Sequence, residues 1–274
     1  MSTNTKSMKL NTNTRSMLID ITRCVGCGAC TEACLQAHGL TTNVDDIKDL
    51  SAGALTFVSE QGDLYVRRMC MHCLEPTCVS VCPVGALHQT KDGPVIYDAS
   101  KCLGCRYCLQ ACPFNVPRYE WDKVVPGVAK CDFCVTRQAQ GLQPACAEAC
   151  PEEATVFGTR DELLAEAHRR INENPDAYYP HVFGENEVGG TSMLILSPVP
   201  FDTLGYPRAL PHEPLSTRTW ASLSHVPDIV TIGGAMLLAI WWITKRREEV
   251  ARVESAERIA AQESNGVHPG GGHA

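Results

Sequence analysis

The cysteines of this chain fall into four groups of four, and none of the 16 is left over. Every group closes with the same C-x3-C step, and proline follows the last cysteine in three of the four groups. A motif repeated in this way constrains the fold more than composition does, because each copy must build the same local structure. The groups are Cys24, Cys27, Cys30 and Cys34; Cys70, Cys73, Cys78 and Cys82; Cys102, Cys105, Cys108 and Cys112; and Cys131, Cys134, Cys146 and Cys150.

The spacing within the groups indicates iron–sulfur clusters. The third group, with Pro113 behind it, reads C-x2-C-x2-C-x3-C-P, which is the bacterial ferredoxin signature for [4Fe–4S] clusters. Three thiolates surround one cluster and the fourth cysteine points to a different one. We therefore predict four [4Fe–4S] clusters held by groups that work in pairs. The spacing leaves two pairings open: neighbouring groups together, or the first with the fourth and the second with the third.

Two other uses of cysteine fit this chain less well. A structural zinc site takes two C-x2-C pairs and has no need of a C-x3-C step in every group. Disulfide frameworks are typical of small secreted chains, and cysteines so close in sequence are poor bridge partners. The 274 residues are 44% hydrophobic, which is enough for a core. A net charge of −7 and 6% aromatic residues argue against a nucleic-acid partner.

Residues 70–117 carry a family resemblance, and they read CMHCLEPTCVSVCPVGALHQTKDGPVIYDASKCLGCRYCLQACPFNVP. The stretch resembles the four-cluster electron-transfer subunits of membrane-bound respiratory oxidoreductases. The resemblance extends over residues 17–245 and is nearest to the iron–sulfur subunits of hydrogenase-2-type [NiFe] hydrogenases, with formate dehydrogenase beta subunits next. It implies an α+β fold of tandem bacterial-ferredoxin-like modules in a pseudo-twofold arrangement, with one transmembrane helix at the carboxyl end.

The resemblance also implies the nested pairing and a definite ligand set for each cluster. The implied ligands are Cys24, Cys27, Cys30 and Cys150 for cluster 1; Cys34, Cys131, Cys134 and Cys146 for cluster 2; Cys70, Cys73, Cys78 and Cys112 for cluster 3; and Cys82, Cys102, Cys105 and Cys108 for cluster 4. Basic residues stand beside several ligands and would raise cluster potentials by favouring the reduced form, although ordinary surface cations explain each of them equally well. They are Arg23, Arg67, Arg68, Lys101, Arg106 and Lys130.

The chain divides into segments that differ in their expected structure. Residues 1–16 are expected to be disordered, 17–158 to form the four-cluster domain, and 159–225 to form a helix, a strand and a proline-rich arm. Thr159 and Glu162 make a capping box that starts a helix ending near Ile171, and Met193–Leu196 reads as a strand. Seven prolines between residues 175 and 214 indicate an extended segment that packs along a partner rather than forming a core.

The uncharged run from Ile229 to Thr244 predicts a membrane anchor. Sixteen residues span about 24 Å as a helix, slightly less than the ~30 Å hydrocarbon layer, and the alternative is a buried core helix. Trp241 and Trp242 suit the interfacial aromatic belt. We therefore expect a transmembrane helix over residues 226–245. The twenty residues after Thr244 contain five Lys or Arg, which places residues 246–274 in the cytoplasm and the cluster domain outside.

These features together predict a non-catalytic electron-transfer subunit. No nucleophile, general base or phosphate-binding loop is recognisable, so the chain is expected to have no small-molecule substrate of its own. Its partners would be a catalytic oxidoreductase subunit, most naturally a [NiFe] hydrogenase, and an integral membrane quinone-reactive subunit. A formate dehydrogenase or other molybdopterin oxidoreductase is the alternative. Residues 1–16 lack an export signal, so we expect export across the cell inner membrane with a partner that carries a twin-arginine signal, leaving the clusters in the periplasm. A soluble carrier would need neither the anchor nor the arm.

Overall fold

The computed structural model describes residues 14–124 and 126–265. Residues 1–13, most of the segment expected to be disordered, lie outside the described residues, whereas strand β1 already begins at Arg15. The chain divides into two compact units, residues 1–218 and 219–274. The first unit has a mixed α/β fold and holds all sixteen cysteines.

A three-stranded sheet organises the first unit. Its central strand β1 (Arg15–Asp20) pairs antiparallel with β8 (Thr155–Thr159) and parallel with β9 (Met193–Leu196). Alternate residues of β1 point to opposite faces: Leu18 packs toward helix α6, whereas Met17 and Ile19 enter the larger core that contains several cysteines. The sheet thus joins segments more than 130 residues apart and separates a helical layer from the cysteine-rich layer.

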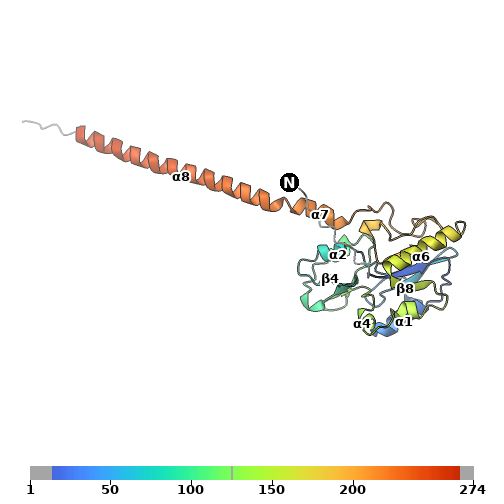
Figure 1. The fold of residues 1–274 in the computed structure, drawn as a ribbon. Coiled ribbons are helices and arrows are strands. Elements are labelled where there is room, and N and C mark those ends of the chain that lie inside the picture. The colour runs from blue at the N-terminus through green and yellow to red at the C-terminus, as the bar shows by residue number, and fades with distance from the viewer. Residues whose placement is uncertain (1–13, 125, 266–274) are drawn as a thin grey trace, which may run out of the picture. The chain divides into compact units, whose positions relative to one another are not determined.

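Helix α6 (Arg160–Glu173) covers one face of this sheet (Figure 1). It starts at the predicted capping box, in which Glu162 Oε2 accepts hydrogen bonds from the Thr159 backbone N–H at 3.3 Å and the Thr159 hydroxyl at 2.6 Å. Leu163 and Ala167 lie on its buried face. Both this helix and the strand at Met193–Leu196 are confirmed.

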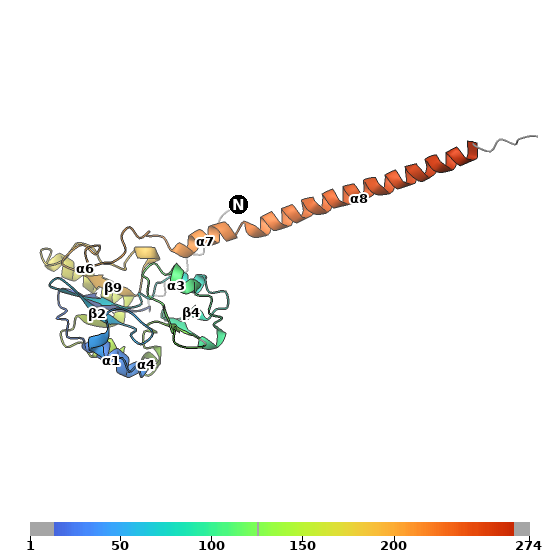
Figure 2. The same cartoon turned by 180° about the vertical axis from the view of Figure 1, so that it is seen from behind.

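The cysteine-bearing segments form hairpins and short helices around the other face. Figure 2 shows α1 and α4 side by side at one end of the body, with α3 and β4 on the side away from α6. The remaining elements of this part are α1 (Ala29–His38), η1 (Val44–Asp46), β2 (Phe57–Gln61), β3 (Leu64–Arg68), α2 (Thr77–Ser80), β4 (Leu87–Gln89), β5 (Val95–Tyr97), η2 (Ala99–Lys101), α3 (Tyr107–Ala111), β6 (Arg118–Tyr119), β7 (Val128–Ala129), α4 (Val135–Ala139), α5 (Ala145–Glu148) and η3 (Glu187–Gly189).

The proline-rich segment contributes to the core of the first unit, whereas we expected it to pack along a partner and to form no core of its own. Phe201, Leu204 and Tyr206 are buried with Met17 and Phe183 in the main hydrophobic cluster. Tyr206 also lies beneath the Arg68 guanidinium, which is 4.4 Å from the ring centre. The prolines interrupt regular structure, but the aromatic residues between them are apolar enough to bury against the body.

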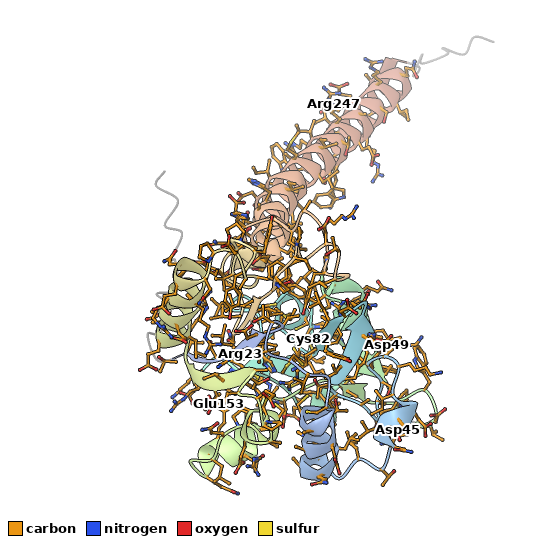
Figure 3. All side chains as sticks on the ribbon, turned by 90° about the vertical axis from the view of Figure 1, so that its right-hand side faces the viewer. Arg23, Asp45, Asp49, Cys82, Glu153 and Arg247 are labelled. Atoms are coloured by element: carbon orange, nitrogen blue, oxygen red, sulfur yellow. The ribbon has the colours of Figure 1, made fainter. Side chains whose placement is uncertain are left out.

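The described part of the second unit is mainly helical, with the end of α7 (Leu215–Leu223) followed by α8 (Val226–Asn265). Over Val226–Gln262 this helix is long and apolar enough to cross a membrane, with a mean hydropathy of 1.7 in a window that is 0% buried. That composition is consistent with a single-pass anchor. The helix continues beyond the predicted span through Arg247, labelled in Figure 3, into the charged segment.

Candidate iron–sulfur cluster sites

Two cavities are each lined by four cysteines. Cys24, Cys27, Cys30 and Cys150, called set 1 below, line one cavity together with Arg67. Cys82, Cys102, Cys105 and Cys108, called set 4, line the other. Each set draws three thiols from one loop and the fourth from a distant part of the chain. In Figure 3 the labelled Arg23 and Glu153 mark the two chain segments that bring Cys24 and Cys150 together.

The other eight thiols also lie near one another, because each raises the pKa of its neighbours. Cys131 lies near Cys34, Cys70 and Cys146, and Cys134 lies near Cys146. We group Cys34, Cys131, Cys134 and Cys146 together. These four are called set 2. Cys73 interacts with Cys70, Cys78 and Cys112, which together form set 3. All sixteen cysteines, every one within the described residues, are free thiols.

The sets follow one another in a row, because a thiol of each set interacts with a thiol of the next. Cys30 of set 1 interacts with Cys146 of set 2. Cys131 of set 2 interacts with Cys70 of set 3, and Cys78 of set 3 with Cys108 of set 4. The two ends of the row reach the surface, since Cys27 and Cys105 are exposed. The order is therefore set 1, set 2, set 3, set 4.

The four groups share one backbone turn. The residue immediately before the second cysteine has a positive φ in every group: 70° at Gly26, 44° at His72, 72° at Gly104 and 62° at Phe133. This turn directs backbone N–H groups toward the preceding thiol. The distance from N to Sγ is 3.4 Å from Gly104 to Cys102 and 3.3 Å from Phe133 to Cys131. The sequence repeat is thus also a repeat of conformation, and N–H groups aimed at sulfur suit cluster ligation.

Glycine is required at two of these turns by crowding as well as by φ. A Cβ atom on Gly104 would lie 2.5 Å from the Tyr119 hydroxyl oxygen, and one on Gly26 would enter the Tyr65 ring. The other two turns carry His72 and Phe133, whose rings stack with centres 5.0 Å apart. A residue held at positive φ costs about 1–3 kcal/mol when it is not glycine. The stack links the set 2 and set 3 loops.

Burial makes most of these thiols poor free anions. Burial raises the pKa of Cys24 and Cys30, raises that of Cys78 to about 12, and raises that of Cys131 well above its usual value. Cys82 differs. Burial opposes its ionisation too, but backbone N–H groups from Val84 to Leu87 lower its pKa. Buried thiolates need a cation to balance them, and iron supplies that charge.

Two buried donors test whether the residues fit such clusters. His72 Nδ1 accepts a hydrogen bond from Val95 N at 3.0 Å, so the ring proton is assigned to Nε2, which has no partner among the described residues. Arg67 Nη2 is likewise buried without a partner that meets hydrogen-bond geometry. Arg67 lines the cavity of set 1 and His72 lies in the loop between Cys70 and Cys73, where thiolate and cluster sulfurs would be the acceptors. The donors, the thiols and the cavities therefore fit [4Fe–4S] clusters.

Comparisons with known proteins agree with this geometry. The 4Fe-4S dicluster domain family matches residues 62–160. Hydrogenase-2 operon protein HybA of Escherichia coli is 37% identical over 237 residues, which cover 70% of this chain and 72% of the relative. The chain therefore belongs to the family of iron–sulfur subunits that includes this hydrogenase-2 protein. A formate dehydrogenase iron-sulfur subunit of Haemophilus influenzae is 32% identical, covering 81% of this chain and 78% of the relative. A protein of Nitratidesulfovibrio vulgaris is 39% identical over 89% of this chain.

The iron–sulfur subunit carries [4Fe–4S] clusters, and its basic residues differ in their relation to them. Lys101 pairs with Asp98, and Arg106 lies 4.7 Å from the Trp121 ring centre. Arg67 and Lys130 are buried instead. Lys130 Nζ donates to the carbonyl oxygens of Val95 and Cys131. The spacing of the sequence does not distinguish the buried cations from the others.

A histidine and an aspartate of the iron–sulfur subunit, neither of them predicted from the sequence, lie beside set 2. His38 Nε2 lies 3.0 Å from Asp132 Oδ1, and His38 Nδ1 lies 3.7 Å from Cys34 Sγ. Asp132 Oδ1 also accepts from Cys134 N at 2.7 Å. The hydrogen bonds to Asp132 and Cys34 raise the pKa of His38 to about 11 despite its burial. The available signal was that His38 follows Cys34 by one helical turn.

Proposed function

We propose that the chain relays electrons through four [4Fe–4S] clusters between a catalytic oxidoreductase subunit and a quinone-reactive membrane subunit. The observation that carries this proposal is the row of four cysteine sets with an exposed thiol at each end. Each cluster, when bound, takes up and passes on one electron at a time. The protein contributes position, burial and hydrogen bonds to sulfur, and it needs no general acid or nucleophile.

We assign one cluster to each set, which is the nested pairing. The cavity lined by Cys24 and Cys150 supports this assignment for set 1, and the cavity lined by Cys82 and Cys108 supports it for set 4. Sets 1 and 2 would form one ferredoxin-like module and sets 3 and 4 a second, related by a pseudo-twofold axis. The matching turns at His72 and Phe133, and the stack between their rings, support that relation.

The catalytic partner that we favour is a [NiFe] hydrogenase. The support is similarity to hydrogenase-2 operon protein HybA over 72% of that protein. A formate dehydrogenase is the second candidate, supported by 32% identity over 78% of a formate dehydrogenase iron-sulfur subunit. Identification of the large subunit that purifies with this chain separates the two.

We infer that α8 anchors the subunit in the inner membrane with its charged end in the cytoplasm and the clusters in the periplasm. Lys245, Arg246 and Arg247 follow the apolar run, and cytoplasmic flanks are enriched in such residues. Protease treatment of intact spheroplasts should digest the cluster body and spare the tail. Digestion of the tail alone would contradict this topology.

Replacement of one ligand tests the relay. Cys150→Ser should remove or alter the cluster of set 1 and reduce quinone reduction by the complex at least tenfold. Dye reduction measured directly at the catalytic subunit should persist. Loss of both activities would count against a relay. Metal analysis adds a stoichiometric check: about sixteen iron and sixteen sulfide per chain are expected for four cubane clusters, whereas zinc would refute them.

A further inference from the structure

Arg67, on strand β3, carries a buried positive charge without a carboxylate partner. Arg67 is 3% exposed. The guanidinium donates from Nε to Thr56 Oγ1 at 3.1 Å and from Nη1 to Thr155 Oγ1 at 3.3 Å. Within residues 14–124 and 126–265, Nη2 has no partner that meets hydrogen-bond geometry, and the groups that affect the guanidinium charge are thiols rather than Asp or Glu. Burial of an ion is costly unless another charge balances it.

Besides the two threonine hydroxyls, the guanidinium lies beside the Met17 sulfur, 3.7 Å from Nη1, and beside thiols of two cysteine sets. Arg67 lines the cavity of set 1 together with Cys24, Cys27, Cys30 and Cys150. It also interacts electrostatically with Cys146 and Cys131 of set 2. The charge therefore lies where the first two sets of the row adjoin.

We propose that Arg67 is the counter-ion shared by the clusters of sets 1 and 2 and that its charge raises the reduction potentials of both. A [4Fe–4S] cluster ligated by four thiolates is anionic, and one-electron reduction adds a further negative charge. A fixed cation favours the more negative form, and the low-dielectric surroundings strengthen that preference. Arg67 thereby eases electron entry into this end of the row. This inference rests on the proposed function.

A purely structural role is the competing explanation, because the guanidinium also ties β3 to Thr56 and to Thr155 of β8. The neighbouring residue provides a matched control. Arg68 points to the opposite face of β3, where it stacks on Tyr206 and donates to the Leu204 carbonyl oxygen. Neither of these two contacts of Arg68 involves a cysteine. Loss of the positive charge at residue 68 therefore removes no contact named here between a cation and a thiol of sets 1 and 2.

The test is an EPR-monitored redox titration of the intact complex with R67Q, R67K and R68Q variants. Cys27→Ser and Cys134→Ser variants identify the signals of sets 1 and 2. R67Q should lower the one-electron reduction constants of these two clusters by about tenfold or more, equivalent to about 59 mV each. The clusters of sets 3 and 4 should change less than about threefold. R67K, which retains the charge, should stay within about threefold of the parent at all four clusters, as should R68Q.

The outcomes decide between charge and structure. Equal shifts at all four clusters in R67Q, no shift at all, or a matching shift in R68Q would overturn the proposal. If R67Q fails to assemble clusters, full assembly with parental potentials in R67K supports the counter-ion role, and failure of both refutes it. The relay itself is judged separately, because a parental complex with four clusters and active quinone reduction retains its function whatever Arg67 does.

Discussion

At the scale of single residues, the left-handed turn before the second cysteine makes Gly104 hard to replace. Gly104→Ala should force a Cβ atom against the Tyr119 hydroxyl at φ +72°. We expect a loss of about 2–4 kcal/mol from backbone strain and crowding together. The midpoint temperature of cluster loss, followed by visible absorbance, should fall by several degrees.

Gly141 is the control for that substitution. It has φ +77°, but a Cβ atom added there would meet no other atom within 4 Å. Gly141→Ala should therefore cost only the backbone strain, about 1–2 kcal/mol. Equal losses of stability in Gly104→Ala and Gly141→Ala would show that the Tyr119 side chain moves aside without cost and that crowding contributes nothing.

His181 gives the fold a dependence on pH that is separate from the clusters. Its Nε2 lies 2.6 Å from Glu187 Oε1, and this bond raises the pKa of His181 above 6.5. The pKa of Glu187 is lowered, since hydrogen bonds from His181 and backbone N–H groups outweigh its burial. A raised histidine pKa stabilises the fold fully below pH 6.5 and ceases to do so as pH rises through the folded value.

His181→Gln should therefore reduce stability at pH 6 and have little effect at pH 9. Because the histidine side chain is 36% exposed, solvent screening limits the difference to about 0.5–1 kcal/mol. The measurement is the difference in Tm between parent and variant across this pH range. A difference that does not change with pH would mean that the imidazolium charge has no part in the interaction.

Residue roles divide into those readable from spacing and those that depend on tertiary burial. The spacing of the sixteen cysteines is enough to identify four repeated groups. The charge environment of Arg67 cannot be predicted in this way, because Arg67 and Arg68 are adjacent in sequence and only strand pairing decides which side chain faces the sulfurs. His72 is hidden for the same reason, since its unpaired Nε2 follows from a hydrogen bond to Val95 more than twenty residues away.

At the scale of elements, the capping box decides where α6 begins. Thr159→Ala removes the hydroxyl that bonds Glu162 and should cost about 0.5–2 kcal/mol. A Tm lower by about 1–8 °C, measured by far-ultraviolet circular dichroism, is expected for a body of this size. Thr159→Ser retains the hydroxyl and should stay within about 1 °C of the parent. An equal loss in both variants would assign the effect to the threonine methyl group.

Elements with local signals could be predicted, whereas those held by distant partners could not. The helix at Thr159 has a cap and an apolar face within fourteen residues. Strand β8, immediately before that helix, was not predicted, because it pairs with β1 about 140 residues earlier. The burial of the proline-rich segment could not be predicted for another reason. The spacing of its prolines correctly excludes helix but does not show where Phe201 and Tyr206 are buried.

At the scale of the whole molecule, the division into two units predicts that the anchor is separable. A chain that stops after residue 225 keeps the sheet, the three buried clusters of hydrophobic side chains and every cysteine. It should appear in the soluble fraction with unchanged visible absorbance per chain, whereas the full chain should sediment with membranes. Sedimentation of the shortened chain, expressed without partner subunits, would contradict a sole anchor in α8.

Under the ligand assignment that we propose, the cavity shared by Cys24 and Cys150 gives the sites an order of completion during synthesis of the chain. Every cysteine of sets 3 and 4 has been synthesised by residue 112, so these two sites are complete while the ribosome is still extending the chain. The thiols of Cys24, Cys27 and Cys30 emerge earlier still, but their site stays one ligand short until residue 150 leaves the exit tunnel. The first loop to be made is thus among the last to be closed, and it must be kept reduced in the meantime.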